Sequence, residues 1–297
     1  MKAKKAILLM LALVLAVPLV ACGSADDDKI VVAGKNFTEQ DILAHMMASL
    51  IEAKTDLKVE RKTFLGGTQV VHNALINGSV DLYPEYTGTG WTATLKQKTI
   101  TDPQEMYEKV KKAYEEKFSV VWLEPFGFNN TYTLTMRTDH AEKLGVETFS
   151  DLLKHAPNLV LGSTQEFLER PDGYKGLQET YGFRFKSAKG MDAGLTYGAV
   201  KEGAVDVIDG FSTDGRIPAF NLKILKDDKQ FFPPYHAAPI IRQDTLKAHP
   251  ELEQVLNLLA GKLDEKTMAM LNAQVDLEGK KARDVAENWL REQGLIQ

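Results

Sequence analysis

The chain has 297 residues, of which 36 are Lys or Arg and 41 are Asp or Glu, and its formal net charge is -5 at pH 7. At roughly 150 residues per domain, this length predicts about two domains. A content of 44% hydrophobic and 26% charged residues is typical of a globular protein and excludes a disordered chain, a collagen and a polytopic membrane protein. The charge balance argues against a nucleic-acid binder, and a single cysteine excludes a disulfide framework and a cysteine-based zinc site.

The N-terminal segment has the features of an export signal. Early lysines precede an apolar run, residues 6–20, which is shorter than the ~20 residues of a membrane-spanning helix but fits the core of a signal peptide. Leu19-Val20-Ala21 followed by Cys22 resembles a lipoprotein cleavage box, which implies removal of residues 1–21 and attachment of lipid to Cys22. Residues 22–28 would form a solvated spacer, and the folded part would work outside the cytoplasm on a membrane face. The alternative is an ordinary signal peptide with an incidental cysteine.

The rest of the chain alternates between strand-like and helical segments. Strand-like runs occur at 30–32, 58–64, 80–83, 120–122, 159–161 and 205–208. Helical patterns occur at 38–51, 68–76, 103–118, 173–181, 193–202, 251–262, 264–272 and 278–292. Asp102 is the expected N-cap of its helix, with Pro103 at the first helical position.

This alternation predicts an α/β layer architecture. The local likeness between Asn77-Gly78-Ser79-Val80-Asp81 and Glu202-Gly203-Ala204-Val205-Asp206 predicts two similar α/β lobes.

A search for catalytic chemistry finds no strong candidate. The histidines show no HExxH pattern or comparable metal-ligand spacing, and there is no GxSxG nucleophile elbow. Gly88-Thr89-Gly90 lacks the Lys-Ser/Thr ending of a phosphate loop. Carboxylates such as Asp81 and Asp206 are better explained by turns and helix caps than by paired acid–base chemistry. The sequence therefore predicts neither an enzyme nor a cofactor or metal requirement.

Aromatic residues recur beside polar, turn-forming residues. The four segments are Pro84–Gly90 with Tyr86, Asn129–Thr133 with Tyr132, Gly210–Gly215 with Phe211, and Phe232–His236 with Tyr235. Each places a ring at or near the end of an expected strand, which is the edge where open α/β sheets bind ligands. Any one ring is equally well explained as core packing, but four rings facing one cleft would suit a quaternary ammonium ion, which π faces stabilise by ~0.5–2 kcal/mol per ring.

Three motifs in this order resemble the osmoprotectant-binding lipoproteins of ABC importers for glycine betaine, choline, carnitine and related solutes. They are Gly34–Gln40, the Tyr-Thr-Gly-Thr at 86–89, and Phe211–Ile217. The resemblance runs from about Lys29 to the C-terminus. It implies an α/β, two-lobed periplasmic-binding-protein fold of type II, with lobe I formed by 29–133 and 237–297 and lobe II by 134–236.

The resemblance also implies a site. Tyr86, Tyr132 and Tyr235 match three walls of the family's aromatic cage, and Phe211 matches the fourth, where familiar members carry tyrosine. Gln40 and Thr89 match polar positions that touch the other end of the ligand, and a neutral Thr89 favours betaines over strict choline selectivity.

The expected partners are a small quaternary-ammonium ligand and a permease driven by a cytoplasmic ATPase, with the protein itself a lipid-anchored monomer. Two alternatives stay open. The same fold could bind an amino acid or another small solute, which would predict an Arg or Asp clamp in the cleft; Arg137 and Arg216 lie nearest the motifs in sequence. A lipid-anchored enzyme would instead predict a nucleophile–base pair or a metal cluster.

Overall fold

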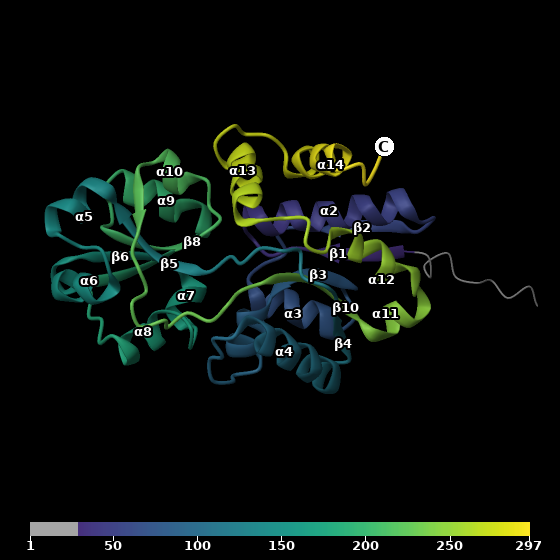
Figure 1. Cartoon of the computed structure of the whole chain (residues 1–297), viewed down its shortest axis with the longest axis horizontal. Coiled ribbons are helices and arrows are strands. Elements are labelled where there is room, and N and C mark those ends of the chain that lie inside the picture. Colours follow the sequence, from purple (N-terminus) through teal and green to yellow (C-terminus); the bar gives the residue numbers. More distant parts are fainter. Residues whose placement is uncertain (1–28) are drawn as a thin grey trace, which may run out of the picture.

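The computed structural model describes residues 29–297, so the expected signal peptide, spacer and Cys22 lie outside the described residues. Two five-stranded mixed sheets organise the chain, each with helices packed on its faces (Figure 1). We call the unit around the first sheet the first lobe and the unit around the second sheet the second lobe. This is the two-lobed α/β architecture that the sequence predicted. No helix within residues 29–297 has both the length and the apolar character needed to cross a bilayer.

The first sheet has the strand order β2-β1-β3-β10-β4, in which β10 runs antiparallel to both of its neighbours. Its strands are β1 (Lys29–Ala33), β2 (Lys58–Lys62), β3 (Leu82–Tyr86), β4 (Val120–Trp122) and β10 (Ala237–Arg242). The helical elements of this lobe are α2 (Thr38–Lys54), α3 (Thr68–Ile76), the π-helical turn η1 (Thr89–Thr94), α4 (Pro103–Phe118), α11 (Gln243–Ala248), α12 (Glu251–Leu256), η3 (Asn257–Leu259), α13 (Glu265–Asp276) and α14 (Ala282–Glu292).

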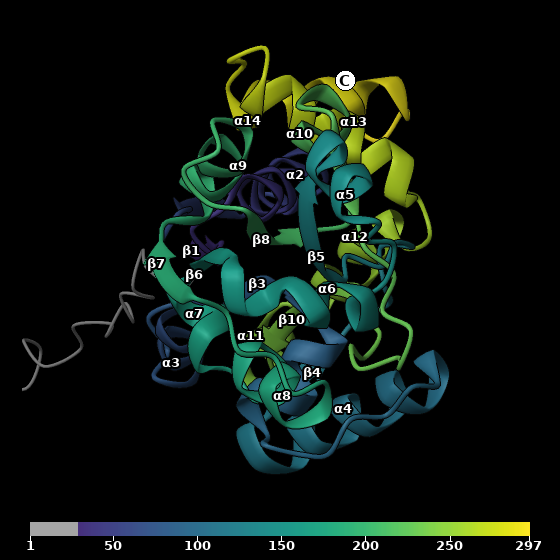
Figure 2. The same cartoon turned by 90° about the vertical axis from the view of Figure 1, so that its left-hand side faces the viewer.

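The second sheet has the order β7-β6-β8-β5-β9, with β5 antiparallel to its neighbours. Its strands are β5 (Tyr132–Arg137), β6 (Val160–Thr164), β7 (Ser187–Met191), β8 (Val207–Phe211) and β9 (Leu222–Ile224). Its helices are α5 (Thr138–Leu144), α6 (Phe149–His155), η2 (Ala156–Asn158), α7 (Gln165–Glu169), α8 (Tyr174–Thr180), α9 (Ala193–Lys201) and α10 (Arg216–Ala219). Figure 2 views the molecule from the side of this lobe.

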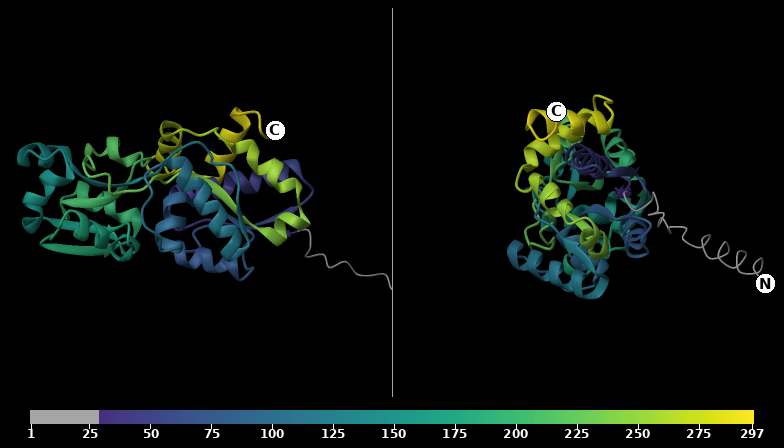
Figure 3. Two further views of the ribbon diagram at one scale, coloured as in Figure 1. Left: turned by 60° about the horizontal axis from the view of Figure 1, so that its bottom comes forward. Right: turned by 90° about the vertical axis from the view of Figure 1, so that its right-hand side faces the viewer.

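Two extended segments join the lobes (Figure 3, left). The chain crosses from β4 to β5 and returns from β9 to β10. The two crossings meet in an antiparallel bridge between Asn129 and His236, and the Asn130 amide donates to the Tyr235 carbonyl at 3.1 Å. After β10 the chain stays with the first lobe, where α14 packs against α2.

Local sequence explains several of the element boundaries. The Asp102 carboxylate accepts from the Glu105 amide at 2.8 Å and Pro103 occupies the first turn of α4, which confirms the expected N-cap. Helix α2 begins at Thr38 as expected.

The third strand of each lobe starts later than the sequence suggested, at Leu82 and Val207. Strand β3 continues through Pro84, which the sequence analysis had assigned to a turn. Proline is rare in a central strand because it has no amide hydrogen to donate. Here Pro84 lies opposite Pro239 of β10. Their carbonyls accept from the Gln40 side chain and the Leu123 amide, so they point away from each other. Pro84 and Pro239 therefore form a non-hydrogen-bonded pair of the antiparallel ladder. At such a pair neither residue donates its amide hydrogen to the other strand, so two prolines are tolerated.

Candidate functional site

A cavity of about 260 Å³ lies between the lobes. Its lining includes first-lobe residues such as Lys35 and Thr89, and second-lobe residues such as Arg170 and Phe211. Tyr132, the first residue of β5, adds to the second-lobe side, and the crossing segments contribute Asn130 and Tyr235. Because both lobes and both crossings supply its walls, the size of this cavity depends on how the lobes are placed.

The structure brings the four sequence-predicted rings to this cavity, each at a strand end. Tyr86 is the last residue of β3, Phe211 the last of β8 and Tyr132 the first of β5, while Tyr235 shortly precedes β10. The Tyr132 ring lies 5.2 Å from the Phe211 ring and 5.6 Å from the Tyr235 ring, centroid to centroid. Tyr132 and Phe211 are also direct partners in the β5–β8 register.

Phe37 is a fifth ring at the same cavity, which the sequence analysis did not assign to the site. It stacks on Phe211 with 5.1 Å between centroids and on Tyr86 with 6.3 Å. We call Phe37, Tyr86, Tyr132, Phe211 and Tyr235 the aromatic wall. Phe37 directly precedes α2, so its position follows from where that helix begins; its place inside the Gly34–Gln40 motif was the available signal.

Two cationic side chains, which the sequence analysis also missed, lie against the aromatic wall. The Arg170 guanidinium carbon is 5.2 Å from the Tyr132 ring centroid, and Lys35 Nζ is 5.4 Å from that of Tyr86. Neither Arg137 nor Arg216, the arginines nearest the motifs in sequence, lines this cavity.

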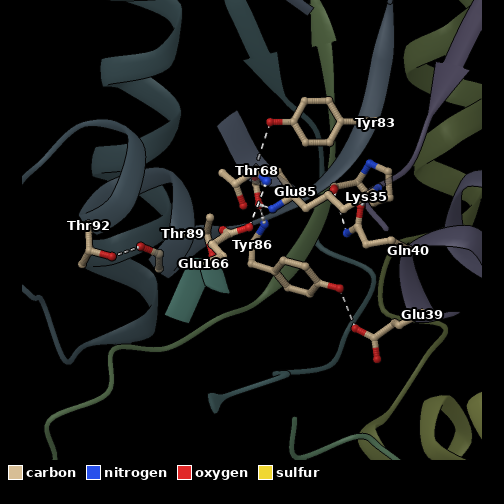
Figure 4. A network of polar contacts seen from close by, with 12 residues as sticks. Lys35, Glu39, Gln40, Thr68, Tyr83, Glu85, Tyr86, Thr89, Thr92 and Glu166 are labelled. Atoms are coloured by element: carbon tan, nitrogen blue, oxygen red, sulfur yellow. Dashed lines mark hydrogen bonds and ion pairs between the residues drawn. The ribbon is translucent and has the colours of Figure 1, made fainter. Parts of the chain in front are cut away.

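Both cations are paired with carboxylates. Lys35 Nζ donates to the buried Glu85 carboxylate at 2.5 Å, a contact that Figure 4 includes. Arg170 donates to both oxygens of Asp172, at 2.9 and 2.6 Å, and Tyr235 donates its hydroxyl to the same carboxylate at 2.7 Å.

Thr89 and Gln40 occupy different positions. Thr89 lines the cavity, and its hydroxyl oxygen accepts from Arg170 Nη2 at 3.1 Å. Gln40 is fully buried and does not line the cavity. Its amide donates to the Pro84 carbonyl at 2.8 Å and accepts from the Lys35 amide at 3.2 Å (Figure 4). Gln40 thus fixes the backbone behind the cavity wall.

A carboxylate from the second lobe also crosses the cavity. Glu166 accepts from the Thr68 amide at the start of α3, 3.1 Å away, and from Arg170 at 3.0 Å. Burial opposes the ionisation of Glu166, but Arg170, Lys35 and Thr68 outweigh it and hold its pKa below the ordinary value. The first lobe therefore meets an anion of the second lobe at a helix N-terminus, where negative charge is stabilised.

Within residues 29–297 there is no cluster of three or more His, Cys, Asp or Glu side chains that could hold a metal ion. The cavity instead combines aromatic faces with charged and amide groups, which is the pattern of a small-molecule binding site.

Two α/β lobes that enclose such a cavity define a class, the solute-binding proteins. The chain belongs to the family of substrate-binding domains of ABC-type glycine betaine transport systems, whose match covers residues 28–292. It is therefore a substrate-binding protein of ABC transport. Binding proteins of ABC importers are extracytoplasmic.

Individual relatives agree with this family. The chain is 41% identical over 271 residues to the carnitine transport binding protein OpuCC of Listeria monocytogenes, covering 91% of this chain and 88% of that protein. It is 40% identical over 291 residues to the ergothioneine transport permease/ergothioneine binding protein EgtU of Helicobacter pylori. That match covers 98% of this chain but 52% of the relative, so the chain spans about half of its length. A crystal structure of a glycine betaine/carnitine/choline ABC transporter is 38% identical, with a TM-score of 0.73, and covers 90% of this chain and 100% of its own.

Proposed function

We propose that the cavity captures a quaternary-ammonium solute for import and that the aromatic wall holds its trimethylammonium head. The observation that carries this proposal is the meeting of five rings, from both lobes and one crossing segment, at one cavity. A trimethylammonium group has no N–H and cannot donate a hydrogen bond. A carboxylate beside it therefore forms no hydrogen bond, whereas the π faces of aromatic rings still attract its charge. Tyr86, Tyr132, Phe211 and Tyr235 keep the role given to them by the sequence, and Phe37 joins them.

At the other end of the ligand, Thr89 and Arg170 would receive a carboxylate. Both line the cavity and already contact each other. Thr89 accepts from Arg170 with its oxygen, so its hydroxyl hydrogen could donate to the ligand. Arg170 also donates to Asp172 and Glu166, so it would offer a ligand carboxylate its one remaining N–H. Gln40, which the sequence placed at the ligand, would act from behind by holding the Lys35 backbone.

The size of the cavity favours betaines larger than glycine betaine. A cavity of roughly 150 Å³ holds a benzene molecule, and this one is about 260 Å³. Carnitine fits that range. Ergothioneine, for which the Helicobacter relative is named and which is itself a trimethylammonium betaine, is a second candidate.

The remaining parts of the proposal concern the cell. The lobes, divided at 133/134 and 236/237, would close on the ligand, and the closed monomer would dock on a permease driven by a cytoplasmic ATPase. No reaction is catalysed. Lipid on Cys22 would anchor the protein to the outer face of the cell membrane; Cys22→Ser should then release it from the membrane fraction, and unchanged fractionation would contradict the anchor.

One titration series tests the ligand assignment. Calorimetry with carnitine, glycine betaine, choline, ergothioneine and arginine, with glycine as the unmethylated control, should give binding by at least one trimethylammonium compound and much weaker binding by glycine. If glycine binds as tightly as glycine betaine, the aromatic wall is not a cation site and the amino-acid alternative replaces it.

A further inference from the structure

We propose that Glu39 is a positioning residue that joins the closure of the two lobes to the placement of the Tyr86 ring. The inference rests on the proposed closure around a ligand. It adds a residue that does not line the main cavity and to which the sequence gave no part.

One oxygen of the Glu39 carboxylate contacts the aromatic wall and a crossing segment. Glu39 lies in the first turn of α2 and is 2% exposed. Its Oε1 accepts from the Tyr86 hydroxyl at 2.7 Å, the contact drawn in Figure 4, and from Asn130 Nδ2 at 2.8 Å. The Tyr86 hydroxyl is thereby held in one direction, which fixes the ring that faces the cavity.

The other oxygen contacts the second lobe. Oε2 accepts from the Thr213 hydroxyl at 2.5 Å and from Asn272 Nδ2 at 3.2 Å. Thr213 follows β8 of the second lobe, whereas Asn272 lies on α13, which belongs to the first lobe and lies between the lobes in Figure 1. Asn272 also donates to the Thr213 carbonyl at 3.0 Å, so the hydroxyl and the carbonyl of Thr213 are both bound by first-lobe residues.

The approach of the second lobe at this point is close. A Cβ atom built on Gly215 would lie 2.6 Å from the Ala273 Cβ and 2.8 Å from the Ala269 carbonyl oxygen. The loop after β8 therefore reaches the surface of α13 only because Gly215 has no side chain. When the lobes separate, this contact and the Thr213 hydrogen bond separate together.

The chemistry of Glu39 makes it sensitive to the loss of a donor. Among residues 29–297, no Lys, Arg or His forms an ion pair with it, and burial raises its pKa although four donors favour the ionised form. A buried carboxylate without a cation depends on its hydrogen bonds, and removing one leaves part of the desolvation cost uncompensated. The contact with Thr213 therefore completes the site that holds Tyr86.

A matched pair of substitutions tests the inference. Thr213→Val removes the hydroxyl that crosses between the lobes. Thr245→Val is the control, because Thr245 is also buried and also donates to a carboxylate, Asp81 at 2.9 Å, but within the first lobe. We expect Thr213→Val to weaken the binding of carnitine or glycine betaine by about five- to tenfold, mainly through faster dissociation. Thr245→Val should lower the melting temperature but leave the affinity within about twofold of the parent.

A double-mutant cycle then separates coupling from general loss of stability. Thr213 and Tyr86 contact different oxygens of Glu39, so the effects of Thr213→Val and Tyr86→Phe on affinity should be non-additive if Glu39 couples them. Within Glu39→Gln, where the carboxylate is replaced by an amide, this non-additivity should disappear. Additive effects in the parent background, or equal effects of the two threonine substitutions on affinity, would overturn the inference.

Solution scattering provides a readout that does not need a ligand. Thr213→Val should raise the radius of gyration of the ligand-free protein, whereas Thr245→Val should not. If the parent binds none of the trimethylammonium compounds, the proposed function fails and scattering alone decides this inference. Equal radii for the parent and Thr213→Val would then overturn it.

Discussion

The two lobes are built on the same plan but hold their cavity rings differently. Both sheets place an antiparallel strand fourth in the order, β10 in the first lobe and β5 in the second. In both, an aspartate before the third strand in the sheet order accepts from a backbone amide of the neighbouring strand: Asp81 from Val31 of β1, and Asp206 from Val160 of β6, each at 2.8 Å. The last residues of the equivalent strands β3 and β8 are Tyr86 and Phe211.

The equivalent turns are also alike. Gly78 and Gly203 both have positive φ values, +79° and +74°, which glycine adopts without strain. Each faces an arginine that ends the antiparallel strand, Arg242 in the first lobe and Arg137 in the second. The likeness of the two lobes thus extends from strand order to individual side chains.

The difference lies at the cavity. The Tyr86 hydroxyl is hydrogen-bonded to Glu39, whereas Phe211 has no hydroxyl and is held by stacking on Phe37 and by the Tyr197 hydroxyl on its backbone amide. Phe37 stacks on both rings, but only the Tyr86 ring also has a polar contact, through its hydroxyl. This teaches that the shared plan positions the rings, while the residues around each ring decide how firmly it is held.

The largest expected effect concerns Asp209, the second-lobe counterpart of Pro84. Burial raises its pKa to about 6, although the Thr164 amide and hydroxyl favour the ionised form. The folded protein therefore binds this proton more tightly than the unfolded chain, in which aspartate titrates near ~3.9. The contribution of Asp209 to stability is fully present below about pH 4 and is lost as the pH rises to about 6, a loss on the order of 3 kcal/mol.

Asp209→Asn tests this, because asparagine does not titrate. The free energy of unfolding from urea titrations should shift in favour of the variant, relative to the parent, by on the order of 3 kcal/mol between about pH 4 and about pH 7. The first lobe has Pro84 at this position, and a proline side chain does not titrate. A difference between variant and parent that does not change with pH would contradict the prediction.

The next effect compares the two strand-end rings directly. Tyr86→Ala should weaken glycine betaine binding by about 1–2 kcal/mol or more, roughly tenfold upward, because it removes a π face and a donor to Glu39. Phe211→Ala removes only a π face and should cost less, and Tyr86→Phe should cost less than Tyr86→Ala. Calorimetry measures all three, with Tyr107→Ala as a control that does not line the cavity. Equal losses for the two alanine variants would show that Glu39 does not matter for holding the ring.

A smaller effect concerns the paired aspartates. Asp81→Ala leaves both the Val31 amide and the Thr245 hydroxyl without their acceptor, whereas Asp206→Ala leaves the Val160 amide. We expect a loss of about 1–2 kcal/mol in the free energy of unfolding for Asp81→Ala and about 1 kcal/mol for Asp206→Ala. Denaturant titrations of both variants measure this. A larger loss in the second lobe would break the proposed equivalence.

Much of this plan could be read from the sequence. The likeness of Asn77–Asp81 to Glu202–Asp206 indicated two similar lobes, and the four rings were found because turn-forming residues mark strand ends. Pro84 misled the strand assignment because its partner across the sheet, Pro239, is distant in sequence. Arg170 was missed for a similar reason: no local pattern says what a side chain will meet across a cleft formed by segments that are far apart in the chain. Phe37 and Glu39 lie inside the Gly34–Gln40 motif, but the motif alone does not say what their side chains contact.

The smallest expected effect is Phe211→Tyr, which gives the second lobe the ring of the first. The π face that would contact a cation is kept, and Phe211 is only partly buried at the cavity, so an added hydroxyl keeps some contact with water and costs little. Phe211 has no hydroxyl, so the second lobe has no counterpart of the hydrogen bond between Tyr86 and Glu39. The Phe211 ring is held by stacking on Phe37. We therefore expect carnitine and glycine betaine affinities within about threefold of the parent, with any change toward tighter binding. Calorimetry with both ligands measures the change, and melting curves check folding. A loss of tenfold or more would mean that the second lobe excludes a hydroxyl at this position, and that the two strand ends are equivalent in backbone only.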